Sequence, residues 1–186
     1  DESGNYIYIT DLTAGKTIST SDCNIHSRYN KDTESCKWVS SLNKVECHIK
    51  TSEIEVNTDI CVSQEFNVEL RKVSIYNTTK DKREILINTY IEPAMTDYMT
   101  NLVHPSFANL QIETYYDKEL DTLVASKRKR SDDENDLFVF SRLVGVSLDK
   151  DFETEKKKLY DNDETAYNGK LTKYPLWPVL SFRGKI

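Results

Sequence analysis

The chain has 186 residues, of which 38% are apolar, so it can bury a core, and disorder over its whole length is excluded. Its 25 basic and 31 acidic residues give a net charge of -6, which offers no basic field for a nucleic acid backbone. No apolar run approaches the roughly 18 residues of a membrane-spanning helix. The sequence begins at Asp1 without a signal-like segment. We therefore expect a domain excised from a longer chain, soluble and cytoplasmic.

The first half of the chain shows the two-residue alternation of apolar and polar side chains that is typical of β-strands. The runs are rich in β-branched and aromatic residues, and they cover residues 6–10, 45–49, 54–62, 68–76 and 83–91. Turn-forming residues occupy positions 77–82, between the last two runs. This pattern predicts a long antiparallel hairpin from Val68 to Tyr90.

The second half continues in the same way and contains little helical periodicity. Runs at 110–116 and 122–126 flank a turn at 117–121, which predicts a second hairpin, and residues 137–144 form another predicted strand. One helix of about two turns is predicted from Phe152 to Leu159. Many short strands without intervening helices predict an all-β fold, a two-sheet antiparallel β-sandwich with little helix. With five glycines and four prolines the chain lacks a flexible linker, so we expect one domain over residues 1–186.

The sequence contains no motif for a metal, a phosphate or a nucleophile. The four cysteines, Cys23, Cys36, Cys47 and Cys61, include no Cys-x-x-Cys pair, and the three histidines are not spaced as metal ligands. We expect free thiols rather than two disulfides, no metal and no cofactor. The basic run 127–130 precedes an acidic block at 132–136, so a solvated loop is favoured over a nuclear-import or nucleic-acid patch.

The segment that begins at His104 is the strongest candidate for a contact site. His104 precedes Pro105, which restricts the backbone, and Phe107 is expected to anchor the segment in the core. A histidine on such a rigid loop at the end of a sandwich can hydrogen-bond a ligand or a neighbouring domain. The alternative is that His104 only caps the turn. We select His104 and Ser106 as candidate carbohydrate or interface contacts and Phe107 as a structural anchor.

Three stretches together resemble a known family. They are VELRKVSIYN and the two residues after it (68–79), TYIEP (89–93) and HPSFANLQIET (104–114), and they are similar to the N-terminal β-sandwich domain of glycoside hydrolase family 94. Weaker similarities follow in the same order, at 6–11, in the Phe152-Glu153-Thr154-Glu155 signature and at 178–183. The resemblance covers nearly the whole chain. The His-Pro-aromatic segment is most similar to the long-chain β-1,2-glucan phosphorylases and synthases of the family, including the 1,2-β-oligoglucan phosphorylases.

The resemblance implies a supersandwich of the galactose-mutarotase-like type. It also implies that the general acid and the phosphate-binding residues lie in an α/α barrel domain that follows in the same chain, so no catalytic residue is expected here. Expected partners are that barrel, a β-glucan or oligosaccharide, and a second copy in a full-length homodimer, but not nucleic acid or a membrane span. At residues 158–163 the sequence lacks the Gly-Arg-rich turn of its relatives, so no contact of that turn is carried over.

Three functions follow as hypotheses. The first is a non-catalytic N-terminal sandwich that supports the barrel, the dimer and the substrate cleft of an inverting phosphorylase or glucan synthase acting on β-glucans. The second is a free-standing carbohydrate-binding module, because the 11 tyrosines with Trp38 and Trp177 could stack on sugar rings. The third is a mutarotase-like sugar epimerase, which requires a histidine base opposite a carboxylate.

Overall fold

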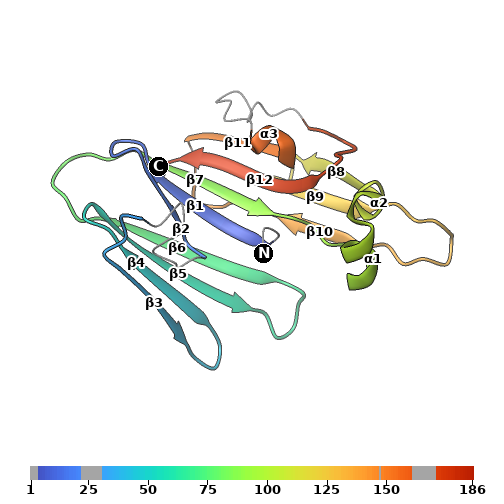
Figure 1. The fold of residues 1–186 in the computed structure, drawn as a ribbon, viewed down its shortest axis with the longest axis horizontal. Coiled ribbons are helices and arrows are strands. Elements are labelled where there is room, and N and C mark those ends of the chain that lie inside the picture. The colour runs from blue at the N-terminus through green and yellow to red at the C-terminus, as the bar shows by residue number, and fades with distance from the viewer. Residues whose placement is uncertain (1–3, 22–30, 147, 161–170) are drawn as a thin grey trace. The chain divides into compact units, whose positions relative to one another are not determined.

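The structure is a computed structural model that describes residues 4–21, 31–146, 148–160 and 171–186. It is 49% strand and 9% helix, and its strands pair antiparallel in three sheets (Figure 1). The all-β sandwich predicted from the alternating runs is confirmed. The chain groups into two compact units, residues 6–86 and residues 1–5 with 87–186, which are described separately.

The unit of residues 6–86 contains a hairpin and a four-stranded sheet. Strands β1 (Asn5–Asp11) and β2 (Lys16–Ser19) form the hairpin, in which Ile9 faces Ile18. The sheet has the order β3 (Ser35–Ser40), β4 (Val45–Lys50), β5 (Ile54–Val62) and β6 (Glu69–Asn77). Alternate side chains of β4 and β5 are buried, among them Cys47, Ile49 and Val56, because one face of the sheet is turned inward.

The other unit is a two-layered sandwich with two small helices after its first strand. One layer has the order β10 (Phe138–Ser141), β9 (Thr122–Lys127) and β8 (Ile112–Asp117). In the other layer β12 (Pro178–Lys185) lies between β11 (Leu148–Glu155) and β7 (Ile85–Ile91). The helices are α1 (Tyr98–Val103), α2 (Pro105–Asn109) and, after β11, α3 (Lys156–Tyr160). The core between the layers is built from Met95, Ile112, Leu123, Ala125, Leu180 and Phe182.

Two sequence predictions about elements are wrong. The hairpin from Val68 to Tyr90 does not form, because β6 pairs with β5 and β7 belongs to a different sheet. The segment between them is held elsewhere: the Leu12 N–H donates to the Glu84 carbonyl at 2.9 Å. The helix predicted from Phe152 begins only at Lys156, since residues 152–155 pair with β12 as a strand. The second hairpin, β8 with β9, is confirmed.

The cysteines also differ from the prediction. Cys47 and Cys61 are free thiols, as predicted, and burial raises the pKa of the Cys47 thiol to about 11. Cys36 is disulfide-bonded, so the prediction of four free thiols is wrong at this position. Cys23 lies outside the described residues. The solvated loop predicted after Lys127 is confirmed, with Lys129 Nζ 3.1 Å from the Asp136 carboxylate.

Candidate functional site

His104 lies at the junction of the two short helices that follow β7. Asp97 caps α1 by accepting the Thr100 N–H on its carboxylate at 2.9 Å. The backbone of His104 then ends α1 and begins α2, donating to the Thr100 carbonyl at 2.9 Å and accepting from Ala108 at 3.1 Å. Its imidazole makes no capping hydrogen bond and, like the Ser106 side chain, is exposed. The backbone of His104, and not its side chain, therefore caps the two helices, and the imidazole is accessible to a partner.

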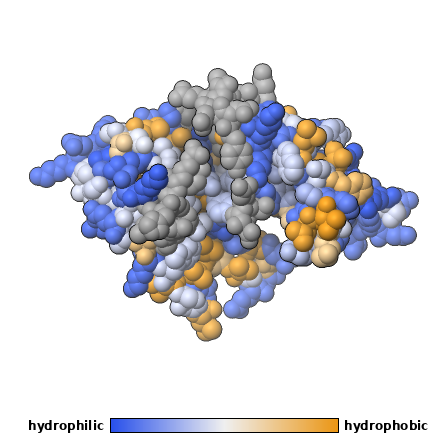
Figure 2. All heavy atoms as spheres, in the orientation of Figure 1, coloured by the Kyte–Doolittle hydropathy of each residue, from blue (hydrophilic) through white to orange (hydrophobic). Residues whose placement is uncertain are grey.

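Phe107 is not the core anchor that the sequence predicted. Its side chain is 53% exposed, and the Arg130 guanidinium lies 4.9 Å from its ring centroid. Ala108 is the buried residue of α2, because only one face of so short a helix can turn inward. Apolar side chains are exposed over α1 and α2, where Figure 2 shows a hydrophobic patch: Tyr98, Met99, Leu102, Val103, Phe107 and Leu110.

A pocket of about 90 Å³ lies beside these helices, and we call it the Trp177 pocket. Pro105, between the two candidate contacts, lines it, whereas His104 and Ser106 are not among its described lining residues. The remaining walls come from the segment after β7, from α1 and α2, from the first residue of α3 and from the start of β12: Glu92, Pro93, Ala94, Asn101, Asn109, Lys156, Trp177 and Pro178.

The charged groups of the Trp177 pocket form a fixed ion pair. Lys156 Nζ lies 2.6 Å from Glu92 Oε1, and the Tyr90 hydroxyl donates to the same carboxylate oxygen. Both charged side chains are 20% exposed. Such a half-buried pair keeps its geometry better than a surface pair and presents one anionic and one cationic hydrogen-bonding group at a defined position.

The signature Phe152-Glu153-Thr154-Glu155 builds the wall that holds Trp177. Glu155 accepts the backbone N–H of Leu176 at 2.8 Å and that of Trp177 at 3.2 Å, and the Lys156 N–H donates to the Trp177 carbonyl at 2.9 Å. Glu153 is fully buried and accepts the N–H groups of Thr154 and Glu155 at 2.8 and 2.9 Å. Carboxylates that accept backbone donors in this way fix local geometry. The signature is therefore a positioning device for Trp177 and Lys156.

These groups suit binding rather than bond cleavage. The indole of Trp177 is partly exposed, and the amides of Asn101 and Asn109 can both donate and accept hydrogen bonds. Glycoside cleavage requires two carboxyl groups about 5–10 Å apart, one of them an acid or a nucleophile. The described lining of the pocket has one carboxylate, Glu92, and it is paired with Lys156. Within the described residues, no group of three or more His, Cys, Asp or Glu could hold a metal ion.

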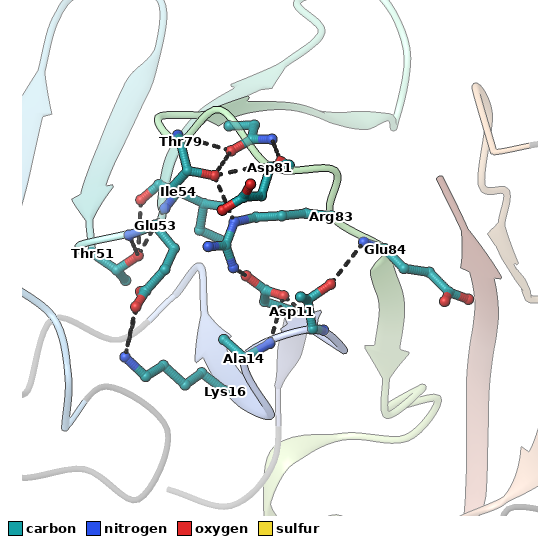
Figure 3. Close-up of polar contacts among 12 residues, drawn as sticks. Asp11, Ala14, Lys16, Thr51, Glu53, Ile54, Thr79, Asp81, Arg83 and Glu84 are labelled. Carbon is teal, nitrogen blue, oxygen red and sulfur yellow. Dashed lines mark hydrogen bonds and ion pairs between the residues drawn. The ribbon is translucent and has the colours of Figure 1, made fainter.

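A larger pocket, of about 160 Å³, lies in the unit of residues 6–86, and three of its charged side chains, Asp11, Lys16 and Glu53, are held in ion pairs (Figure 3). Asp11 accepts the N–H groups of Thr13 and Ala14 at 2.9 and 3.0 Å and pairs with Arg83 at 2.5 Å. Lys16 pairs with the Glu53 carboxylate at 3.1 Å. These contacts connect the turn between β1 and β2 to the loops after β4 and β6. We read the cluster as structural.

A comparison with models of known protein families shows the family to which the chain belongs. A family model described as glycosyl hydrolase 94, supersandwich domain, matches residues 1–174. The chain belongs to this family. The curated protein cyclic beta-(1,2)-glucan synthase NdvB of Rhizobium meliloti (strain 1021) is 26% identical over 147 residues, which is 75% of this chain. The match spans 5% of the length of that synthase. The glycosyl hydrolase 94 relationship inferred from residues 68–114 is thus confirmed.

Family membership supports a carbohydrate-related role within a larger chain. The residues of the Trp177 pocket were only partly visible in the sequence: Glu92 lies in the TYIEP stretch, and Pro105 and Asn109 lie in HPSFANLQIET, both recognised by resemblance. Glu155, which holds Trp177 in place, lies in the Phe152–Glu155 signature. Asn101 and Lys156 carried no sequence signal of their own, because they come from α1 and α3, which meet only in the fold. In the part of the chain described, no helix is long and apolar enough to cross a membrane.

Proposed function

We propose that this chain is the non-catalytic N-terminal supersandwich domain of an inverting carbohydrate phosphorylase or glucan synthase acting on β-glucans. In that role it supports the α/α barrel, takes part in dimer assembly and lends the Trp177 pocket to sugar binding. The observation that carries the proposal is the family match over residues 1–174 together with a pocket that offers an indole, two amides and an ion pair. Such a set is suited to a neutral polyhydroxylated ligand.

The role of a free-standing carbohydrate-binding module is the second candidate, and it shares the same pocket. It differs in predicting useful affinity without any further domain. The epimerase hypothesis has less support, because His104 is exposed at a helix junction and the one carboxylate in the described lining of the Trp177 pocket is ion-paired with Lys156. A base opposite a free carboxylate is what that chemistry needs.

The first experiment tests whether the chain by itself catalyses phosphorolysis. The chain is incubated with inorganic phosphate and β-1,2-glucooligosaccharides, and sugar phosphate is measured against a control without protein. We expect no sugar phosphate above the control, because no described group in the pocket is arranged as an acid facing a phosphate site. Release of sugar phosphate by the chain alone would show that the domain is catalytic.

The second experiment tests the pocket by calorimetric titration with a β-1,2-glucotriose. Trp177→Ala should weaken binding about tenfold, because it removes the only described aromatic surface in the pocket. Trp38→Ala is the matched control, since Trp38 is exposed to the same degree as Trp177 on β3. Equal affinities of Trp177→Ala and the unmodified chain would remove the pocket from the proposal.

His104 and Ser106 stay proposed contacts for carbohydrate or for the dimer. Because the His104 imidazole is exposed, His104→Ala should change the free energy of unfolding of this chain by less than about 1 kcal/mol. In the full-length protein the same change should weaken dimerisation or oligosaccharide turnover. Normal dimerisation and turnover would exclude both roles. A cytoplasmic location belongs to the same proposal.

A further inference from the structure

The three-stranded layer β10-β9-β8 has a second face, which points away from the sandwich core. Leu123 and Ala125 of β9 are fully buried in the core, so the residues between and beside them point the other way. In the strand register Val124 stands between Phe140 of β10 and Tyr115 of β8. Two residue pairs further along, and so on the same face, Phe138 stands opposite Ser126.

Aromatic rings cover this second face and are open to solvent. Phe140 is 62% exposed, Tyr115 is 41% exposed, and the rings of Phe138 and Phe140 are 6.1 Å apart at an interplanar angle of 26°. Val124 between them is only 2% exposed, so the rings stand on both sides of a covered apolar floor. We name this surface the outer aromatic face; it comprises Glu113, Tyr115, Arg128, Phe138, Phe140 and Tyr174.

Polar groups border the rings at one end of the outer aromatic face. The Arg128 guanidinium lies 5.4 Å from the centroid of Tyr174, and Arg128 Nε lies 3.7 Å from the Glu113 carboxylate. Tyr174 reaches the face because its segment lies along β8, where the Thr114 N–H donates to the Lys173 carbonyl at 2.9 Å. Lys173 Nζ approaches the same tyrosine ring at 5.0 Å.

These features indicate the chemical class of ligand that the outer aromatic face would bind. Two cations, Arg128 and Lys173, stand beside the Glu113 carboxylate, so the border carries only a small net charge and no large field that would select a polyanion. Exposed ring faces stack on apolar C–H surfaces, and a paired guanidinium and carboxylate supply donors and acceptors for hydroxyl groups. A neutral ligand with alternating C–H and hydroxyl surfaces satisfies both. Several rings in two rows favour a chain of sugars over a single one.

We propose that the outer aromatic face binds an extended, uncharged β-glucan chain at a site separate from the Trp177 pocket. This inference rests on the proposed function, in which the domain serves an enzyme of β-glucans. The two sites share no residue: the pocket uses residues 92–109, 156, 177 and 178, whereas the face uses residues 113–140 and 174. The pocket would hold one end or one unit of the sugar, and the face would hold the length of a polymer.

The test compares a linear β-1,2-glucan polymer with β-1,2-glucotriose, by affinity electrophoresis and calorimetry respectively. Phe140→Ala and Tyr115→Ala should each weaken polymer binding about fivefold or more and leave trisaccharide binding within about twofold. Trp177→Ala should show the opposite pattern. Tyr76→Ala is the matched control, because Tyr76 is similarly exposed on β6. Thermal melts establish that each variant is folded, and because Phe140 is largely exposed, its variant should melt like the unmodified chain.

The outcomes separate this inference from the proposed function. Unchanged polymer affinity in both face variants, with trisaccharide binding lost in Trp177→Ala, would overturn the inference and leave the proposed function standing. Failure of the unmodified chain to bind polymer or trisaccharide would overturn both. A dimer in sedimentation velocity that dissociates in Phe140→Ala, at unchanged polymer affinity, would make the face a protein interface.

Discussion

Asp11 illustrates how one buried carboxylate can organise several loops. It ends β1, accepts two backbone N–H groups of the following turn, and pairs with Arg83 from 72 residues later. Its side chain is 3% exposed, and that of Arg83 is 11% exposed. Removing one partner of such a pair leaves an uncompensated buried charge.

We expect Asp11→Ala to lower the free energy of unfolding by about 3–5 kcal/mol, measured by urea denaturation. Glu34→Ala is the control, because Glu34 pairs with Lys50 at 3.4 Å but both side chains are about half exposed. That variant should lose less than about 1 kcal/mol. Similar losses in the two variants would mean that Asp11 is no more important than a surface charge.

Tyr116 gives the structure a pH dependence in the alkaline range. Its hydroxyl donates to Asp121 at 2.6 Å, and this hydrogen bond, with burial, raises the pKa of Tyr116 to about 12. Lys150 in turn pairs with Asp121 at 2.5 Å and holds the pKa of that carboxyl below its ordinary value against the opposing effect of burial.

Between pH 10 and 12 the unfolded chain releases the phenolic proton of Tyr116 while the folded chain retains it. The contribution of this tyrosine to stability is therefore complete below about pH 10 and is lost as the pH rises through about 12. Spectrophotometric titration should show a late-ionising tyrosine that is absent in Tyr116→Phe. Asp121→Asn should bring its ionisation back toward pH 10; an unchanged titration in that variant would refute the role of the hydrogen bond.

At the scale of elements, α2 shows which side of a short helix carries stability. Phe107→Ala should change the free energy of unfolding by less than about 1 kcal/mol, because the ring is half exposed and packs only against Arg130 among the contacts described. Ala108→Leu should cost about 1–3 kcal/mol, since Ala108 is 2% exposed and a larger side chain there would have to displace the residues packed around it. Thermal melts of both variants decide this, and the reverse order would restore Phe107 as the anchor.

Sequence reasoning located those strands in which apolar and polar residues alternate within the strand itself. β5 and β8 could be identified because buried side chains alternate with more exposed ones within each run. The prediction of a hairpin from Val68 to Tyr90 was wrong because alternation identifies a strand but not the strand with which it pairs. In the structure β6 pairs along its whole length with β5. Residues 152–155 have helical propensity, but Phe152 faces Phe182 of β12 across the ladder, and tertiary pairing overrides propensity.

The candidate site was predictable only in part. The resemblance led to the segment around His104, and Pro105 within it does line the Trp177 pocket. The pocket itself brings together Glu92 and Lys156, which are 64 residues apart in the chain. The residues around each of them in the sequence give no indication that the two form an ion pair. Phe107 was assigned to the core by its hydrophobicity, although the direction of a side chain on a one-turn helix depends on what packs beneath it.

At the scale of the whole molecule, the chain should unfold as one domain. The division between the two compact units falls inside strands, at Asn5 in β1 and at Ile87 in β7, whereas domain boundaries ordinarily fall in exposed linkers. The family model also spans residues 1–174 without interruption. We expect one calorimetric transition whose van't Hoff and calorimetric enthalpies agree. Two resolved transitions would assign the units to separate domains.

Because Cys36 is disulfide-bonded, the oxidation state of the cysteines can report the cellular compartment in which the chain resides. Reducing cytosol disfavours such bonds, whereas export compartments preserve them. Alkylation of the denatured chain, taken directly from cells and without added reductant, should modify two of the four cysteines if the bond formed in the cell, namely Cys47 and Cys61. Modification of all four would place the chain in a reducing compartment, in agreement with the proposed cytoplasmic location, and would mean that strand β3 works there without its covalent tether.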